Sequence, residues 1–362
     1  MIHRLPGDDN ATRAETVWFK KQTPFEQAEI RRQVEFKRTQ WPGLPATASH
    51  RAGDHEYPHI LPKGHEDKAF FPGFAAEVLD YMRDNEIEVH SEILNLKSSQ
   101  ACCLNLMFPL RRDLGLARRV LQQFNPAVAK VTGVEFEYTG QDEASLGTRA
   151  ATEWLGEPTS GKRGQQRTSI DVAVFWIDHE GRPHTWFIEW KYTERNFGTC
   201  SAYEKNRARC DTIKVTESPA QDCYLVDGGS QHRRRHYWER MGDAGIDVDA
   251  LAKAIGCPFS GPLYQLMRQT QLAAFVRQTG AGQSVEVAVV EFEGNTSLEA
   301  VPPRLTPLQS PEARSIVDIW NQALDGVPRF TTVRAGQLMS AYQATGGYDA
   351  QWRRYISARY GV

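Results

Sequence analysis

The chain has 362 residues, of which 40% are hydrophobic and 24% are charged, which is enough apolar material for one large core or two ordinary ones. No apolar run approaches the roughly 20 residues of a membrane-spanning helix, and residues 1–10 lack the pattern of a secretory signal. We therefore expect a folded cytoplasmic protein that makes no contact with a membrane. The formal net charge of −2 excludes a protein that coats nucleic acid through bulk positive charge, so any DNA contact must come from local basic patches.

The six cysteines form no CxxC pair and show no spacing typical of a secreted disulfide framework. We expect them to be reduced thiols. A cluster of the four cysteines between Cys200 and Cys257 is the alternative.

The first 89 residues predict an arm and a helical subdomain. A charged helix is expected over 24–40, and a connector rich in Pro, Gly and His follows over 41–65. The connector contains HEYPH (55–59), which matches the HExxH pattern of zinc proteases. Pro58 disfavours the continuous helix that would bring both histidines to one metal, so we predict no zinc site here.

Residues 90–295 predict an α/β core, because the hydrophobic period changes there from helical to alternating. A helix is expected at 74–85, just before this core. Within the core and in chain order, we expect helices at 91–107 and 113–124, strands at 133–138, 169–177 and 185–193, helices at 201–210 and 262–279, and a strand at 285–293. The order helix, three strands, helix, strand predicts a central mixed sheet. Residues 296–362 predict a helical region packed on this core.

Two of the predicted strands form a hairpin that brings two acidic residues together. If Ile177 pairs with Pro183 across the short loop, the antiparallel register places Asp171 directly opposite Glu189. Alternation along the second strand puts Lys191 on the same face as Glu189. The opposite face then carries an apolar layer of Trp186, Ile188, Trp190 and Tyr192.

Two opposed carboxylates can form a binding site for a hard cation such as Mg²⁺. The Cβ atoms of such a pair lie about 4.5–5.5 Å apart, and like charges there repel each other. We expect Asp171, Glu189 and the carbonyl oxygen of Trp190 to hold Mg²⁺, for which Mn²⁺ can substitute, so that the metal activates a water and polarises a phosphate. Lys191 is expected to orient or deprotonate that water or to neutralise the phosphate, with a pKa lowered by burial. The predicted reaction is phosphodiester hydrolysis.

The arrangement of Asp171, a hairpin, Glu189 and Lys191 resembles the PD-(D/E)xK nuclease superfamily, with Ile170 at the position of the motif's proline. Longer stretches also resemble an uncharacterised bacterial family of restriction-endonuclease-like proteins; they include YPHILP (57–62), LKSSQACCLNLMFPL (96–110), EWKYTE (189–194) and the terminal RRYISARYGV. The resemblance implies a restriction-endonuclease-like αβββαβ core with a central mixed sheet and helical N- and C-terminal extensions.

The resemblance implies two further elements of the site. An acidic metal ligand is expected from the first core helix, and Glu92 is the matching residue. A glutamine-bearing helix is expected beside the site, where Gln265 and Arg268 lie one turn apart. An exposed polar helix face is the alternative for this pair.

Local basic residues are expected to hold the nucleic acid. Residues 231–240 (QHRRRHYWER) interleave Arg233, Arg234 and Arg235 with His, Tyr and Trp, which is typical of a segment that grips phosphates and stacks on bases. A solvated charged loop is the alternative. Lys205 follows the second hairpin strand and is expected to touch the backbone near the cut.

The sequence therefore predicts a Mg²⁺-dependent DNA endonuclease, in restriction or another defence against foreign DNA. A non-catalytic DNA-binding or assembly module on a nuclease fold is one alternative, and a nuclease acting on RNA or structured DNA is another. Cutting both strands of a duplex favours a homodimer with two-fold symmetry. An ordinary surface salt bridge remains the alternative for the charged trio, although its apolar flanks disfavour it.

Overall fold

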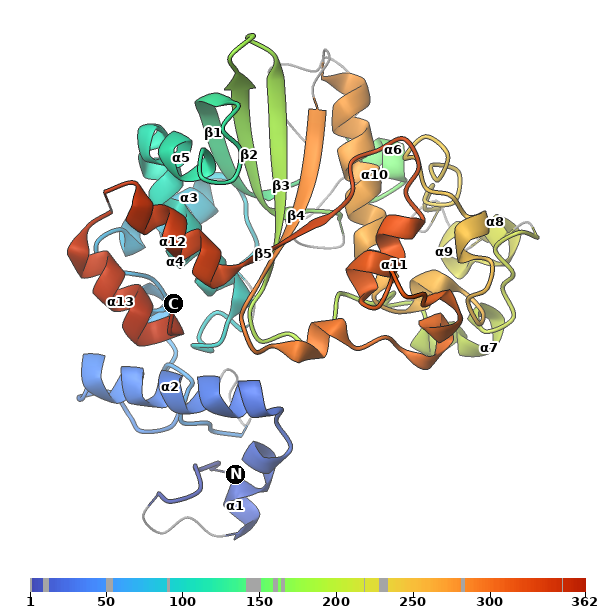
Figure 1. Cartoon of the computed structure of the whole chain (residues 1–362). Helices are drawn as coiled ribbons and strands as arrows, with labels where there is room; N and C mark the ends of the chain where they lie inside the picture. Colours follow the sequence, from blue (N-terminus) through green and yellow to red (C-terminus); the bar gives the residue numbers. More distant parts are fainter. Residues whose placement is uncertain are drawn as a thin grey trace.

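The computed structural model describes residues 2–8, 13–49, 55–89, 92–140, 151–158, 162–163, 167–217, 219–227, 234–280, 284–346 and 348–362. A five-stranded mixed sheet with the order β1-β2-β3-β4-β5 lies at its centre (Figure 1). The strands are β1 (Val128–Tyr138), β2 (Ile170–Asp178), β3 (Pro183–Lys191), β4 (Ser284–Glu291) and β5 (Thr331–Arg334). β1, β2 and β3 are antiparallel neighbours, whereas β4 runs parallel to β3 and β5 runs parallel to β4. The predicted α/β class with a mixed central sheet is confirmed.

Helices cover both faces of the sheet (Figure 1). On one face lie α3 (Ala75–Asp84), α4 (Ser99–Arg112), α5 (Leu114–Leu121), α12 (Ala335–Ala344) and α13 (Ala350–Tyr360). The other face packs against α6 (Ala151–Leu155), α10 (Leu263–Thr279) and α11 (Ile316–Gln322). Short helices α7 (Arg207–Cys210), α8 (Pro219–Asp222) and α9 (Tyr224–Asp227) extend this second layer. The 3₁₀ turns are Glu66–Ala69, Glu204–Asn206, Asp249–Leu251, Pro258–Ser260, Thr296–Glu299 and Pro303–Leu308.

Each face of the sheet has its own apolar core, as the alternation of side chains along the strands requires. Ile188, Trp190 and Tyr192 enter the core beneath α4, and Trp186 packs at its edge. Phe187, one residue out of phase, enters the core beneath α10. The predicted apolar layer opposite Glu189 and Lys191 is thereby confirmed.

The N-terminal helices α1 (Arg13–Lys20) and α2 (Pro24–Gln40) lie at the end of the molecule where α13 ends (Figure 1). The bounds of α2 match the predicted 24–40 because Thr23 and Glu26 form a capping box in front of a proline at the first turn. Tyr192 donates a 2.5 Å hydrogen bond from its hydroxyl to Glu29 Oε2 on this helix. The segment that follows β3 is therefore bonded directly to α2.

Three predicted regions differ most from the structure, and the first strand, predicted over 133–138, begins earlier, at Val128. The helix predicted over 91–107 begins only at Ser99, because Ser98 caps it by accepting a hydrogen bond from the backbone N–H of Ala101, and residues 92–97 form turns before it. Residues 201–210 form turns and two single-turn helices in place of one helix. The C-terminal region is not purely helical, since β5 pairs with β4 and extends the sheet.

The four cysteines between Cys200 and Cys257 line one narrow cavity of about 30 Å³. Burial raises the pKa of the Cys200 thiol to about 11. Within the described residues, no three His, Cys, Asp or Glu side chains are arranged to hold a metal ion. These cysteines are free thiols, as predicted.

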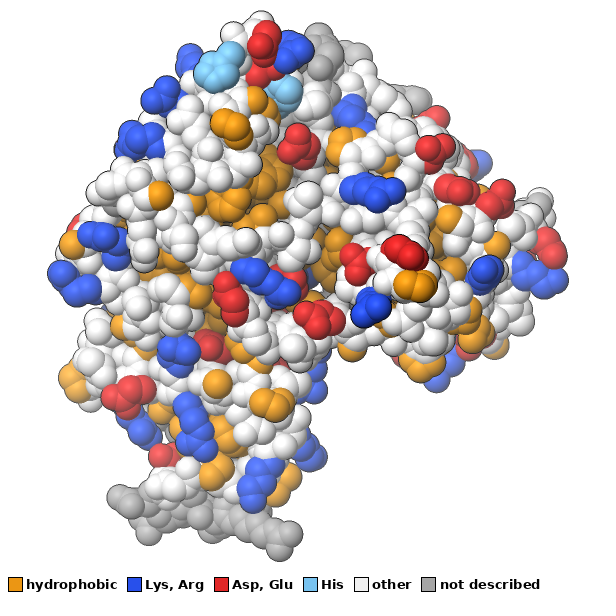
Figure 2. Space-filling model, in the orientation of Figure 1, with side chains coloured by type: hydrophobic (Ala, Val, Ile, Leu, Met, Phe, Trp, Pro, Cys, Tyr) orange, Lys and Arg blue, Asp and Glu red, His pale blue; other side chains and the backbone are white. Residues whose placement is uncertain are grey.

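The surface carries charges of both signs. On the face shown in Figure 2, Lys and Arg side chains alternate with Asp and Glu, and an apolar hollow opens near the sheet. A cavity of about 290 Å³, lined in part by Phe124, Trp176 and Trp186, lies between α5 and the sheet. No helix in the described part of the chain has both the length and the apolarity that crossing a bilayer requires.

Candidate active site

The β2–β3 hairpin has the predicted register. Ile177 pairs with Pro183 and Val172 pairs with Ile188, so the next position along β2, Asp171, faces Glu189. Asp171 Oδ2 accepts a 2.6 Å hydrogen bond from the backbone N–H of Trp190. The carboxylate of Asp171 is therefore fixed against the part of β3 that carries Glu189 and Lys191.

Glu189 is almost completely buried, and its two oxygens accept hydrogen bonds from three side chains. Lys191 Nζ lies 2.7 Å from Glu189 Oε1, and Gln265 Nε2 donates to the same oxygen at 2.6 Å. Gln269 Nε2 donates to Glu189 Oε2. A buried carboxylate needs such donors, because an isolated charge in an apolar setting is strongly disfavoured.

The donors Gln265 and Gln269 come from one helix, α10. Their spacing of four residues places them on the same face of the helix, above the end of β3. Gln265 Oε1 in turn accepts hydrogen bonds from Lys191 Nζ at 3.0 Å and from the backbone N–H of Gly198 at 2.7 Å. A Cβ at Gly198 would lie 3.3 Å from this oxygen, so the absence of a side chain there permits the close approach.

Lys191 carries a stabilised positive charge. Burial of the ammonium lowers its pKa, but the negative charges of Glu189, Glu194 and Asp171 outweigh burial, so the pKa lies above its ordinary value. The prediction that burial would lower the pKa of Lys191 was wrong, because it did not weigh the acids around the ammonium.

Glu137 on β1 is a third acid beside this pair. The pairs Phe136–Val172 and Tyr138–Ile170 flank it, so Glu137 lies next to Asp171 across the sheet. Its backbone has φ +48°, a left-handed conformation that is unfavourable for a residue with a Cβ. Gln100 Nε2 and the Ser169 hydroxyl donate to its two carboxylate oxygens, at 3.2 and 2.9 Å.

The left-handed residue reverses the alternation of β1. Phe136 enters the core beneath α4, whereas Tyr138, two residues later, enters the core beneath α10. Side chains two apart on a regular strand share a face, so the reversal follows from the irregular backbone at Glu137. No sequence pattern marks this position, and Glu137 was not among the predicted site residues.

Burial and the neighbouring acids favour the protonated form of Asp171. Burial raises the pKa of Asp171 well above its ordinary value, and the charges of Glu189 and Glu137 raise it further. Lys191 and the hydrogen bond from Trp190 oppose this shift without cancelling it. The cavity therefore favours either a proton or another cation at Asp171.

A cavity of about 210 Å³ opens above the acids. Its lining combines Glu137, Asp171, Glu189, Gln265 and Gln269 with the residues Arg167, Thr168, Ser169 and Arg268. Arg268 donates from Nε to Thr168 Oγ1 at 2.9 Å and lies 3.3 Å from Glu157 Oε1. The guanidinium groups of Arg167 and Arg268 thus border a cavity whose floor is acidic.

The structure places the other predicted residues differently. Gln265 and Arg268 lie at the cavity, where the resemblance placed them. Glu92 lies in the turns before α4 and lines a separate cavity with Asn95 and Lys97, so the predicted position on a core helix was wrong.

Arg234, Arg235 and Lys205, which were predicted to bind DNA, are not among the residues that line this cavity. Arg235 Nη1 donates to the carbonyl of Gly156 at 2.9 Å, which ties one chain segment to another. Arg234 and Lys205 are exposed. Arg233 lies outside the described residues.

A family model described as Restriction Endonuclease associating with ARP (REase-ARP) matches residues 16–361. The chain belongs to this family. The REase-ARP match includes all five strands and the helices that cover them, and it confirms the resemblance to restriction-endonuclease-like proteins at the level of the family. No curated protein and no solved structure matches the chain.

Proposed function

We propose that this REase-ARP member is a Mg²⁺-dependent DNA endonuclease with a PD-(D/E)xK-type site formed by Asp171, Glu189 and Lys191. The observation that carries the proposal is the hairpin register, which sets two acids face to face with Lys191 Nζ 2.7 Å from Glu189 Oε1. Such a trio costs free energy in apolar surroundings, so perturbed groups of this kind gather at functional sites. The family description, a restriction endonuclease, supports the same role.

The donor set fits Mg²⁺. This ion prefers oxygen ligands, uses one or two protein carboxylates and keeps several waters. Asp171 and Glu189 would supply the carboxylates, and Glu137, which lines the same cavity, would add negative charge beside them without completing a set of three ligands among the described residues. The predicted backbone ligand, the carbonyl of Trp190, accepts a 3.2 Å hydrogen bond from the Ser99 hydroxyl. When bound, the ion would polarise the scissile phosphate and lower the pKa of a water.

The chain's own side chains would orient the attacking water and neutralise the charge of the phosphate. Lys191 keeps its proton at neutral pH because its pKa is raised, so it donates to a water or a phosphate oxygen and does not act as the base. Gln265 holds the ammonium in place through its 3.0 Å hydrogen bond. Arg167 and Arg268 at the cavity wall are suited to bind the phosphates on either side of the cut.

One observation favours the non-catalytic module as a second candidate. The side-chain oxygens of Glu189 already accept hydrogen bonds from Lys191, Gln265 and Gln269. In a binding or assembly module, this network would only hold α10 on the sheet. In the nuclease, a bound metal would replace at least one of these donors at Glu189.

The biological setting follows from the family description. Because that description names an association with ARP, we propose that the chain works with such a partner, in restriction or another defence against foreign DNA. A single site meets one strand at a time, so two copies of the chain would cut a duplex.

The purified chain, incubated with supercoiled plasmid, linear duplex, single-stranded DNA and RNA, tests the proposal. We expect cutting of DNA with Mg²⁺ or Mn²⁺ and none with EDTA. Cutting of RNA alone would change the substrate. An absence of cutting on every substrate, together with no Mn²⁺ binding by calorimetry, would select the non-catalytic module.

Glu137→Gln tests the third acid. The amide keeps an oxygen and the size of the side chain but removes the charge, so we expect the pKa of Asp171 to fall and cleavage to drop by about 10²-fold. Mn²⁺ titration by calorimetry should show weaker binding than in the wild type. Glu135→Gln, on the same strand but outside the cavity lining, is the matched control and should cut normally.

A further inference from the structure

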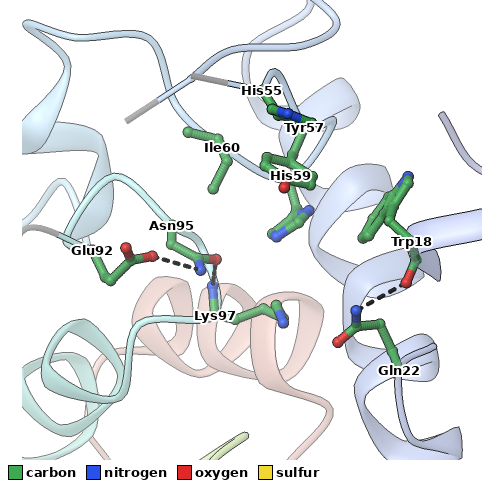
Figure 3. Close-up of a pocket in the computed structure, with 9 residues that line it drawn as sticks. All are labelled: Trp18, Gln22, His55, Tyr57, His59, Ile60, Glu92, Asn95 and Lys97. Atoms are coloured by element: carbon green, nitrogen blue, oxygen red, sulfur yellow. Dashed lines mark hydrogen bonds between the residues drawn. The ribbon is translucent and has the colours of Figure 1, made fainter. Parts of the chain in front are cut away.

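A second, larger cavity of about 440 Å³ lies between the N-terminal helices and the turns before α4. Figure 3 shows its walls: Trp18 and Gln22 come from one side, Tyr57 and His59 from another, and Lys97 extends between them. Its volume falls within the range of about 300–1,000 Å³ that is usual for small-molecule sites. The role proposed for Asp171 and its neighbours uses none of these residues.

Aromatic rings form one wall of the cavity. The Trp18 and His59 rings lie with centroids 5.7 Å apart and nearly parallel, and the Tyr57 ring lies 5.8 Å from that of His59. His3 supports the wall from behind, since its ring stacks on Tyr57 at 4.5 Å. Aromatic walls of this kind bind the flat faces of nucleobases, and such stacking tolerates any base.

Polar groups border the same space. Gln22 Nε2 donates a 2.9 Å hydrogen bond to the backbone carbonyl of Trp18 on one side. Glu92 Oε2 accepts a 3.3 Å hydrogen bond from Asn95 Nδ2 on the opposite side. Burial lowers the pKa of Lys97, with the charge of Glu26 opposing this shift. A planar ligand that carries both hydrogen-bond donors and acceptors, as a nucleobase does, would match the Glu92 carboxylate and the Lys97 ammonium.

The segment that leaves the proposed active site runs to this cavity. Ser99, two residues after Lys97, donates to the carbonyl of Trp190 beside Lys191. Further along the chain, Arg195 Nη2 donates to Gln22 Oε1 at 3.1 Å, and Gln22 lines the cavity. The two cavities are therefore joined by short stretches of chain.

We propose that this cavity binds a single nucleobase of the nucleic-acid substrate, unpaired or rotated out of the stack, while the strand lies across the active site. Trp18 supplies the stacking face, and Lys97 contacts the adjoining phosphate or a base oxygen. The inference rests on the proposed function for its substrate, but binding can be measured without cleavage.

The test is binding of a fluorescein-labelled single-stranded oligonucleotide to the full chain in EDTA, measured by fluorescence anisotropy. Trp18→Ala should raise the Kd about tenfold, and Trp18→Phe should retain most of the affinity because a stacking ring remains. Trp41→Ala is the matched control, since Trp41 packs edge-on against Phe36 and does not line the cavity. Equal Kd values for Trp18→Ala and Trp41→Ala, with both variants folded, would overturn the proposal.

Oligonucleotides with one abasic site at successive positions give a second, independent reading. With the wild-type protein, an abasic site at one position should weaken binding about as much as Trp18→Ala does. With the Trp18→Ala protein, an abasic site at that same position should weaken binding no further. Free mononucleotide that competes at micromolar concentration, with no sensitive abasic position, would show that the cavity takes a free nucleotide and would overturn the strand model. If the wild-type protein cut no substrate but one abasic position still weakened binding in a way that depended on Trp18, only the proposed function would be contradicted.

Discussion

Replacing Asp171 by asparagine is expected to abolish metal-dependent cleavage and, at the same time, to stabilise the fold. Asparagine keeps the oxygen that accepts the hydrogen bond from the backbone N–H of Trp190, so the hairpin stays in register. It removes the charge that would bind the metal, and the rate should fall by about 10²–10³-fold or more. Cleavage of a labelled duplex under single-turnover conditions measures this loss.

The gain in stability follows from the sign of the pKa shift. The pKa of Asp171 is raised in the folded state, first by burial and then by Glu189 and Glu137. The unfolded chain therefore releases this proton at lower pH than the folded chain, so stability falls as pH rises from about 4 toward the folded pKa. Asp171→Asn removes that loss, and its urea midpoint in EDTA should exceed that of the wild type at pH 7 by more than at pH 4.5.

Asp178→Asn is the matched control at the other end of β2. Asp178 accepts hydrogen bonds from the backbone and side chain of Arg182 and pairs with His184 at 3.0 Å. Burial opposes the ionised form, but the hydrogen bonds from His184 and Arg182 hold the pKa of Asp178 below its ordinary value. This variant should lose stability at pH 7 and keep full cleavage. If both asparagine variants cut normally, Asp171 does not bind the metal.

Replacing Lys191 by methionine is expected to remove cleavage and also to destabilise the fold by about 3–5 kcal/mol, as breaking a buried ion pair does. The methionine fills a similar volume but leaves Glu189, which is 2% exposed, with only the amides of Gln265 and Gln269. Urea unfolding in EDTA at pH 7 gives the free energy. Its slope should stay unchanged if only the ion pair is lost.

The double variant Lys191→Met with Glu189→Gln separates charge from packing. Once the buried carboxylate is neutral, most of the lost stability should return, whereas cleavage should not. A Lys191→Met protein as stable as the wild type would mean that the ion pair with Glu189 has no net effect on stability.

The sequence by itself determined the hairpin and its trio. Alternation of apolar residues and a short loop fix the β2–β3 register, and the register alone places Asp171 opposite Glu189. The capping box at Thr23 similarly fixed the start of α2. These features depend on neighbours close in the chain, which is why patterns of spacing find them.

Only the tertiary structure decided the rest of the site. Glu137 lies beside Asp171 at a point where its own backbone is left-handed and breaks the regular geometry of β1. Gln269 reaches Glu189 from a helix about 80 residues away in sequence. Spacing along the chain carries no information about such contacts. The direction of the pKa shift of Lys191 is likewise a sum over groups brought together by folding, in which the acids outweigh burial.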